Sequence, residues 1–269
     1  MSEVLRAQGV CKYFGGLKAV ENVDMTINKE EIFGIIGPNG AGKTTFFNVC
    51  SGIYKPTAGK VFLLGEDITG QLSERIARKG LARTFQNIKL FNFMSVLENV
   101  KVGFHSNIKS NIFDAILHTP TYKRDEAYAI KKGLEIIEMV GLLEYRDTKA
   151  GNLPYGLQRR VEIARAMALE PKLLMLDEPA AGMNPNETQD LVQFIRRLKG
   201  LGYTVAVIEH DMKFVMNCCE RILVLNFGEK ISEGTPDEVK NDKNVQIAYF
   251  GKGIAMGQTV QAEEAGGNA

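Results

Sequence analysis

Residues 37–44 read Gly-Pro-Asn-Gly-Ala-Gly-Lys-Thr, and no other segment constrains the fold of this chain as strongly. The spacing matches a phosphate-binding loop, in which glycines let backbone N–H groups approach phosphates closely. The apolar run from Glu31 to Ile36 predicts a buried strand before the loop, and residues from Thr45 to Ser51 predict the start of a helix after it. Because the N-terminus of that helix would face an anion, the segment predicts a nucleoside triphosphate site.

Each residue type in the loop has a chemical use. We expect Lys43 to reach the β- and γ-phosphates and the Thr44 hydroxyl to ligate Mg²⁺. The alternative, a glycine turn that happens to contain Lys-Thr, is disfavoured because both the spacing and the strand-loop-helix context are present. The residues predicted to hold the nucleotide here are Gly37, Pro38, Asn39, Gly40, Ala41, Gly42, Lys43, Thr44 and Thr45.

Two acidic residues follow a second apolar strand. Residues 173–176 are Leu-Leu-Met-Leu, and Asp177 and Glu178 come directly after them. A parallel strand would deliver these acids to the carboxyl edge of the sheet, beside the phosphate loop. We expect Asp177 to hold Mg²⁺, usually through water, and Glu178 to polarise the water that attacks the γ-phosphorus. The alternative is an exposed acidic turn after a core strand.

Two further polar residues are predicted at the same edge. His210 follows the predicted strand from Tyr203 to Ile208, which favours a contact to the γ-phosphate over a purely structural role. Gln86 ends a short extended segment where the predicted core passes into a helical block. Its amide is an uncharged donor and acceptor, suited to sense the metal or the attacking water.

Composition excludes several classes of function. The formal net charge is +1, which indicates no nucleic-acid partner, and the arginine and lysine pairs, such as Arg159-Arg160, are interpreted as solvated helix faces. The four cysteines have no metal-ligand spacing and are interpreted as reduced. Apolar runs are far shorter than the roughly 20 residues that span a bilayer, so any membrane role must come through a partner.

The order of the predicted elements is typical of an α/β fold. Strand, helix and strand over 172–208 imply a right-handed parallel crossover, in a sheet covered on both faces. From about 91 to 152 the pattern changes to helices, which indicates an inserted helical subdomain. The tail, 251–269, lacks a periodic apolar face and is predicted to be disordered.

Taken together and in this order, these motifs resemble the ATP-binding subunit of ABC transporters over about residues 4–250. The resemblance assigns the Walker A loop to 37–44, the Q-loop to Gln86, the signature to 153–160, the Walker B acids to Asp177 and Glu178, the D-loop to 180–184 and the switch to His210. It implies an ATPase with a P-loop NTPase (RecA-like) core, an N-terminal antiparallel β subdomain and the helical insertion, in one domain over 1–250. It also implies an aromatic that stacks on adenine, Phe14 or alternatively Tyr13, although a core aromatic stays open.

Within the family, the chain is most similar to the ATPases of branched-chain amino acid importers. The features are residues 82–86, Ala-Arg-Thr-Phe-Gln, residues 178–185, Glu-Pro-Ala-Ala-Gly-Met-Asn-Pro, and residues 208–212, Ile-Glu-His-Asp-Met. A lipopolysaccharide exporter, a urea or amide importer and a non-transport ATPase of the family remain alternatives. The signature departs from Leu-Ser-Gly-Gly-Gln, because this chain has Leu-Pro-Tyr-Gly-Leu at 153–157, which leaves Gly156 and the following helix N-terminus.

The resemblance also implies partners. Two ATPase subunits face each other, each ATP lies between the Walker A loop of one and the signature of the other, and Gly156 would therefore act in trans. The altered signature favours a different second ATPase over a homodimer. Two membrane-spanning permease subunits would dock on the Q-loop and helical subdomain, a substrate-binding protein would act indirectly, and the chain would lie at the cytoplasmic face of the inner membrane.

Overall fold

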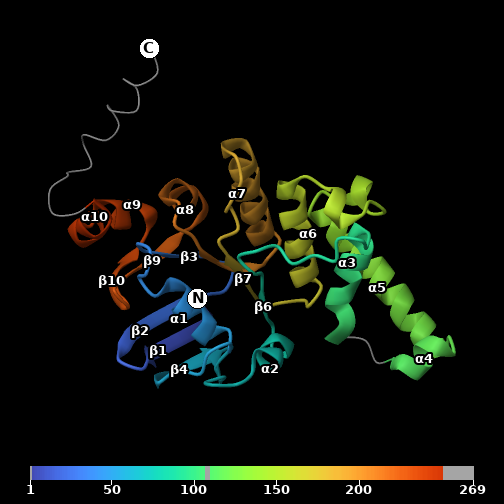
Figure 1. Cartoon of the computed structure of the whole chain (residues 1–269), viewed down its shortest axis with the longest axis horizontal. Helices are drawn as coiled ribbons and strands as arrows, with labels where there is room; N and C mark the ends of the chain where they lie inside the picture. The colour runs from blue at the N-terminus through green and yellow to red at the C-terminus, as the bar shows by residue number, and fades with distance from the viewer. Residues whose placement is uncertain (1, 107–109, 251–269) are drawn as a thin grey trace, which may run out of the picture.

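A computed structural model describes residues 2–106 and 110–250, which form two β-sheets flanked by helices (Figure 1). The tail predicted to be disordered lies outside the described residues. The strands are β1 (Glu3–Phe14), β2 (Leu17–Asn28), β3 (Ile32–Ile36), β4 (Ala58–Leu63), β5 (Glu66–Asp67), β6 (Leu81–Arg83), β7 (Leu173–Asp177), β8 (Thr204–Ile208), β9 (Arg221–Asn226) and β10 (Glu229–Gly234). The helices are α1 (Lys43–Cys50), α2 (Ser73–Arg78), α3 (Val96–Gly103), α4 (Ile112–Ile116), α5 (Pro120–Met139), α6 (Tyr155–Met167), α7 (Pro185–Gly200), α8 (Met212–Cys218), α9 (Pro236–Asn241) and α10 (Lys243–Phe250).

The larger sheet has the strand order β10-β9-β3-β8-β7-β6 and is parallel except for β10 at its edge. Every residue of β3, β7 and β8 is buried. Along β3, Ile32 and Ile36 join one hydrophobic core, while Phe33 and Ile35 join the other. A strand that packs on both faces reads as a continuous apolar run, which is why its sequence shows no polar alternation. The predicted α/β sheet and its parallel crossover from β7 to β8 are confirmed.

The smaller sheet is antiparallel, with the order β2-β1-β4-β5. Its apolar face shares one core with α1 and with one face of the larger sheet. Phe46 and Phe47 of α1 are fully buried in this core. At about 25 cal/mol per Å² of apolar surface, each such ring contributes roughly 2–3 kcal/mol, so helix α1 is fixed firmly between the sheets.

The helical block holds α3, α4 and α5, at the opposite end of the molecule from β1 and β2 in Figure 1. Helix α3 begins with a capping box of Ser95 and Glu98, and it packs against α5 and α6. A Cβ added at Gly133 of α5 would lie 3.0 Å from Leu97 of α3, so the glycine lets these two helices approach closely. The helices predicted over 91–152 are present, and the division into subdomains stays a prediction.

Two expectations about side chains have opposite outcomes. The four cysteines are free, as predicted, and all four are buried. The interpretation of Arg159 as part of a solvated helix face is wrong, because its side chain is 0 % exposed and forms a 2.7 Å ion pair with Glu162. In the described part of the chain, none of the helices combines the length and apolar character needed to span a membrane.

Candidate nucleotide site

The phosphate loop leaves the end of β3 and enters α1, as the sequence predicts. A Cβ at Gly37 would stand 2.1 Å from the carbonyl oxygen of Leu225, and a Cβ at Gly42 would stand 2.3 Å from that of Ala19. Gly42 also has a φ of +93° as the residue that precedes α1. The two glycines are therefore required by close backbone approach, and by conformation at Gly42.

Lys43 is buried at 6 % exposure and is held across the loop. Its Nζ donates to the carbonyl oxygens of Gly37 at 2.6 Å and Pro38 at 3.0 Å. An ammonium has three N–H donors, so these two bonds orient the group and leave one donor for an anion. Burial lowers the pKa of Lys43, and the negative charges of Glu178 and Glu209 oppose that shift.

A cavity of about 650 Å³ opens over the loop. Seven loop and helix residues, 39–45, line it, and so does Glu178 from the end of β7. The structure therefore brings Thr44, Thr45 and Lys43 to the same space as the predicted water-polarising acid. The cavity is completed by residues 16–19 and by Phe227.

Glu178, Gln86 and His210 converge, although they come from three separate segments. The amide Nε2 of Gln86 donates to Oε2 of Glu178 at 2.8 Å, and Nδ1 of His210 lies 3.8 Å from the same oxygen. Glu178 has a φ of +43°, and its backbone N–H donates to the carbonyl of Ile208 at 2.9 Å. A non-glycine residue rarely adopts this conformation. The backbone bond to β8 helps to hold Glu178 in it, and so helps to fix the direction of the carboxylate.

Asp177 is more enclosed than the sequence suggests. Its Oδ2 accepts a bond of 2.6 Å from Arg83 of β6, and its side chain is 5 % exposed. Arg83 also donates to Asn48 at 2.6 Å and to Ser51 at 2.8 Å, so it joins Asp177 to the phosphate-loop helix. The charged partner of Asp177 was not predicted, although Arg83 belongs to the same motif as Gln86.

The predicted metal ligands fit Mg²⁺ by their chemistry. Thr44 offers a hydroxyl, Gln86 an amide oxygen and Asp177 a carboxylate, and hard oxygen donors are those that Mg²⁺ prefers. Among the described residues, none form a group of three or more His, Cys, Asp or Glu side chains that could hold a metal ion. Mg²⁺ is commonly held by one or two carboxylates with phosphates and water, so the donor set suits a metal that arrives with a nucleotide.

Gly156 does not lie in the cavity over the phosphate loop. It lines a separate cavity of about 80 Å³ between α6 and α7, together with Pro154 and Glu187. Pro154 is the N-cap of α6 and provides no side-chain cap. A Cβ at Gly182 would lie 3.7 Å from the ring of Tyr155, so this tyrosine packs beside the D-loop segment. The N-terminus of α6 therefore lies apart from the phosphate loop of its own chain.

Neither predicted adenine-stacking aromatic lines the cavity. Phe14 is 43 % exposed and packs edge-on against Tyr54 at 5.4 Å between ring centroids. The hydroxyl of Tyr13 instead donates to Glu21 at 3.0 Å. The ammonium of Lys12 lies 4.9 Å from the centroid of the Phe14 ring, and contact of either aromatic with adenine stays a prediction.

A buried arginine connects the signature helix with the Q-loop. Arg159 of α6 donates to the carbonyl oxygens of Phe85 and Gln86, each at 2.9 Å, while Glu162 accepts from the N–H of Phe85 at 3.3 Å. Burial raises the pKa of Glu162, and the positive charge of Arg159 opposes the shift. The spacing of three residues on a helix was the signal available in the sequence for this pair.

A second acid was also missed. Glu209 is 1 % exposed, and it accepts bonds from the N–H of Ala180 at 2.8 Å and of His210 at 3.2 Å. Burial raises the pKa of Glu209. Since Ala180 begins the D-loop segment, this carboxylate joins that segment to the end of β8.

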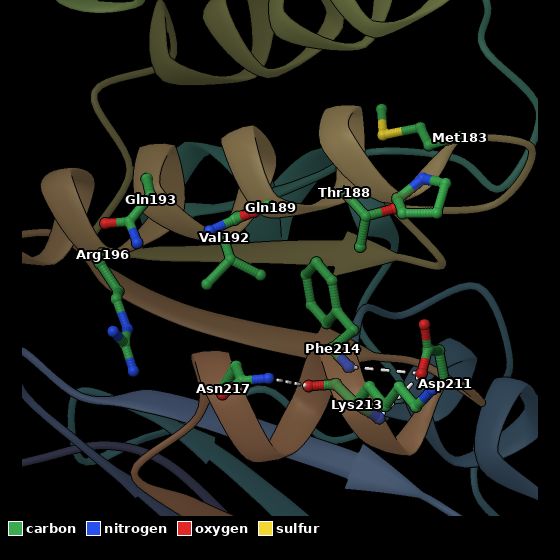
Figure 2. Close-up of a pocket in the computed structure, with 11 residues that line it drawn as sticks. Met183, Thr188, Gln189, Val192, Gln193, Arg196, Asp211, Lys213, Phe214 and Asn217 are labelled. Carbon is green, nitrogen blue, oxygen red and sulfur yellow. Dashed lines mark hydrogen bonds between the residues drawn. The ribbon is translucent and has the colours of Figure 1, made fainter. Parts of the chain in front are cut away.

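Figure 2 shows a groove of about 560 Å³ between α7 and α8, outside the phosphate site. Asp211 caps α8 by accepting from the N–H groups of Lys213 at 2.8 Å and Phe214 at 3.3 Å. None of the phosphate-loop residues lines this groove. The side chains of Asp211 and Asn217 are used in the local structure of α8, and the predicted nucleotide residues line the cavity over the loop instead.

Comparisons with known protein families agree with this geometry. The family described as ABC transporter matches residues 20–181, and the family described as branched-chain amino acid ATP-binding cassette transporter matches residues 229–255. Similar curated proteins include LivG, the high-affinity branched-chain amino acid transport ATP-binding protein of Escherichia coli, which is 45% identical over 93% of this chain and 98% of its own length. BraF, the protein of the same description from Pseudomonas aeruginosa, is 44% identical over the same shares.

Solved structures give the same fold. A nucleotide-free ATP-binding cassette from an ABC transporter aligns with a TM-score of 0.80 at 33% identity, over 93% of this chain and 100% of that one. A cassette in its ADP conformation aligns with a TM-score of 0.82 at 32% identity, over 94% of this chain and 100% of that one. The α/β core, the antiparallel sheet and the phosphate loop are therefore those of a P-loop nucleotide-binding cassette.

Proposed function

Since the chain belongs to the ABC transporter ATP-binding family, we propose that it is the ATP-hydrolysing subunit of an importer for branched-chain amino acids. The observation that carries this proposal is the position of Glu178, which lines the cavity built by the phosphate loop and accepts a hydrogen bond from Gln86. The names of the relatives LivG and BraF supply the substrate class.

In the proposed binding step, the phosphate loop and Lys43 hold the triphosphate. Backbone N–H groups at the start of α1 and the positive end of its dipole face the phosphates. Thr44, Gln86 and Asp177 would hold Mg²⁺ together with phosphate oxygens, Asp177 through water. The chemistry that Mg²⁺ supplies in such a site is neutralisation of the phosphate charge.

In the proposed hydrolytic step, Glu178 polarises the attacking water. Its carboxylate lines the cavity, and the amide of Gln86 fixes one of its oxygens, so the other can accept a proton from water. His210 lies beside the same carboxylate and would contact the γ-phosphate. The contacts of Gln86 and His210 with Glu178 support these roles.

A second ATPase subunit would complete each site. The placement of Gly156 in a separate cavity supports a role in trans, with the N-terminus of α6 directed at the γ-phosphate of the partner's nucleotide. Because the γ-phosphate contacts from the second subunit would form only in the closed pair, ATP would bind the closed and open states with different affinities. Hydrolysis would then reopen the pair.

We place the permease contact at a cavity of about 700 Å³ between the larger sheet and the helical block. Its lining includes Phe85, Val102, His105, Arg165 and Leu169. Phe85 precedes Gln86, so a permease helix docked there would touch the segment that orients Glu178. In this arrangement the chain would be peripheral, at the cytoplasmic face of the inner membrane.

The test is uptake by the reconstituted transporter. The chain would be purified with its permeases and second ATPase in proteoliposomes, with binding protein supplied outside and MgATP inside. We expect ATP-dependent accumulation of leucine, isoleucine or valine, and none with Glu178→Gln. Uptake of urea, or outward movement of lipopolysaccharide, in place of amino acid uptake would contradict the substrate class.

A further inference from the structure

The turn between β9 and β10 is unusual in two ways: a bulky residue has a positive φ, and its aromatic side chain is exposed. Asn226 pairs with Glu229, so Phe227 and Gly228 form a two-residue turn, with φ values of +46° and +83°. Positive φ at both positions is a type I′ turn, which favours Asn-Gly and disfavours a bulky first residue. The Phe227 side chain is also 85 % exposed. A strained and exposed aromatic calls for a functional explanation, because the fold gains nothing evident from it.

The same turn is fixed to the phosphate loop. The N–H of Gly228 donates to the carbonyl of Ala41 at 3.1 Å, and its carbonyl accepts from the N–H of Glu21 at 2.8 Å. A Cβ at Gly228 would stand 3.0 Å from the carbonyl oxygen of Ala19. The position of Phe227 relative to the phosphate loop is therefore set by backbone contacts on both sides of the turn.

The lining of the cavity indicates what Phe227 faces. Residues 39–45 and Glu178 are occupied by the phosphates and the attacking water in the proposed function. The remaining lining consists of residues 16–19 and Phe227, so the nucleoside must lie against these. Phe227 is the one aromatic ring in the lining, and aromatic rings bind bases by stacking.

We propose that Phe227 is a nucleotide-binding residue whose ring packs against the base of the nucleotide on the phosphate loop. The inference rests on the proposed nucleotide-binding function, and it deepens that function by adding a contact from the β9–β10 turn. Stacking does not distinguish bases by hydrogen bonding, so the contact would serve ATP, ADP and GTP alike. The strain at Phe227 is then the local cost of presenting the ring to the base.

The test compares ligands with and without a base on the full-length protein. Phe227→Ala should raise the Kd of MgATP and MgADP by about tenfold, and leave the Kd of Mg-tripolyphosphate within about twofold. Phe227→Tyr should retain nearly normal affinity for all three. Phe113→Ala is the matched control, because Phe113 is 71 % exposed and does not line the cavity.

A second variant separates binding from structure. Phe227→Asn places a favoured residue in the turn, so it should raise the Tm by about 1–3 °C while it weakens ATP binding as alanine does. Equal losses of ATP and tripolyphosphate affinity would overturn the proposal, since the turn would then only shape the loop. Unchanged ATP affinity in Phe227→Ala would also overturn the proposal, even if the variant changed assembly with a second ATPase. Failure of the natural protein to bind any nucleotide would instead refute the proposed function itself.

Discussion

The side-chain amide of Gln86 donates a hydrogen bond of 2.8 Å to Oε2 of Glu178, across 92 positions of sequence. The bond joins the loop after β6 to the end of β7, and one Glu178 oxygen is thereby oriented. Any movement of the Gln86 loop must shift or break this bond. The segment that would sense a docked permease therefore controls the direction of the carboxylate that would polarise water.

Glu178→Gln should keep MgATP binding and slow hydrolysis by roughly 10²-fold or more, because an amide cannot accept a proton from water. The carbonyl oxygen of the new side chain can still accept from Gln86, so the local geometry should persist. Phosphate release under single-turnover conditions and equilibrium ATP binding measure the two effects. Parent-like turnover in this variant would remove Glu178 from the catalytic role.

Asp177→Asn should show the opposite pattern. The loss of charge weakens the donor set for Mg²⁺ and breaks the 2.6 Å ion pair with Arg83, which is nearly buried. We expect a raised Mg²⁺ requirement in ATPase titrations, together with a lower denaturation midpoint. An unchanged Mg²⁺ titration would exclude Asp177 from the metal site.

Lys43→Ala should weaken ATP binding by roughly 10- to 100-fold, since the charge-assisted bond from its remaining donor to phosphate is worth about 1.5–3 kcal/mol. The same change leaves the carbonyls of Gly37 and Pro38 without their buried partner. Isothermal titration with ATP measures the loss, and circular dichroism serves as the control for folding. Near-normal affinity would contradict the phosphate role of Lys43.

The lowered pKa of Lys43 predicts opposite effects of alkaline pH on binding and on stability. Burial disfavours the charged ammonium, so Lys43 loses its proton below the pH at which an ordinary lysine does. ATP affinity should fall as the pH rises through that lowered pKa, because the charge that pairs with phosphate is lost. Over the same window the unfolded chain holds more protons than the folded chain, so this residue's contribution to folding stability should rise.

Affinity and stability measured between pH 7.5 and 10 would check both directions. In Lys43→Ala, the contribution of the Lys43 titration should be lost from the pH dependence of ATP affinity and from that of folding stability. If ATP affinity depended on pH in the same way in the parent protein and in Lys43→Ala, a group other than Lys43 would cause that pH dependence.

Arg159→Met should destabilise the protein by about 3–5 kcal/mol, because it leaves Glu162 as an uncompensated buried charge and frees the carbonyls of Phe85 and Gln86. Arg160→Met is the matched control on the same helix. The Arg160 guanidinium lies 5.6 Å from the centroid of the Phe194 ring, a contact worth about 1 kcal/mol or less. Urea denaturation compares the stability of the two variants, and equal midpoints would mean that the buried ion pair of Arg159 and Glu162 does not stabilise the protein.

Sequence patterns predict the elements of this fold well where one physical cause dominates. The run before the phosphate loop is apolar at every position of β3, because both faces of that strand are buried. Glu178 and His210 could be placed at one edge because parallel strands end there together. Arg159 could not be placed, since a helical arginine is usually solvated and its carbonyl partners come from a loop about 73 positions away. The proposed role of Phe227 could not be predicted from the sequence, because it depends on a turn that is bonded to the phosphate loop.

The altered signature predicts two unequal ATP sites in a heterodimer. Pro154 has neither an N–H nor a hydroxyl to offer a γ-phosphate. Tyr155, which packs beside Gly182, stands where the usual Leu-Ser-Gly-Gly-Gln signature has the first of its two glycines. A lost hydrogen bond to a charged phosphate is worth about 1.5–3 kcal/mol, which corresponds to a difference of roughly tenfold or more. The alternative is that Gly156, other backbone groups and the dipole of α6, worth about 1 kcal/mol, compensate and leave two equal sites.

The two sites can be compared by inactivating them separately in the whole transporter. Glu178→Gln removes the water-polarising acid of one site, and the matching change in the second ATPase removes that of the other. The site that pairs this chain's signature with the partner's phosphate loop should stabilise the closed state less, so the residual ATPase rates of the two variants should differ about tenfold. Equal residual rates, or a complex with two copies of this chain and no second ATPase, would reject the inequality, since the N-terminus of α6 and Gly156 would then suffice at both sites.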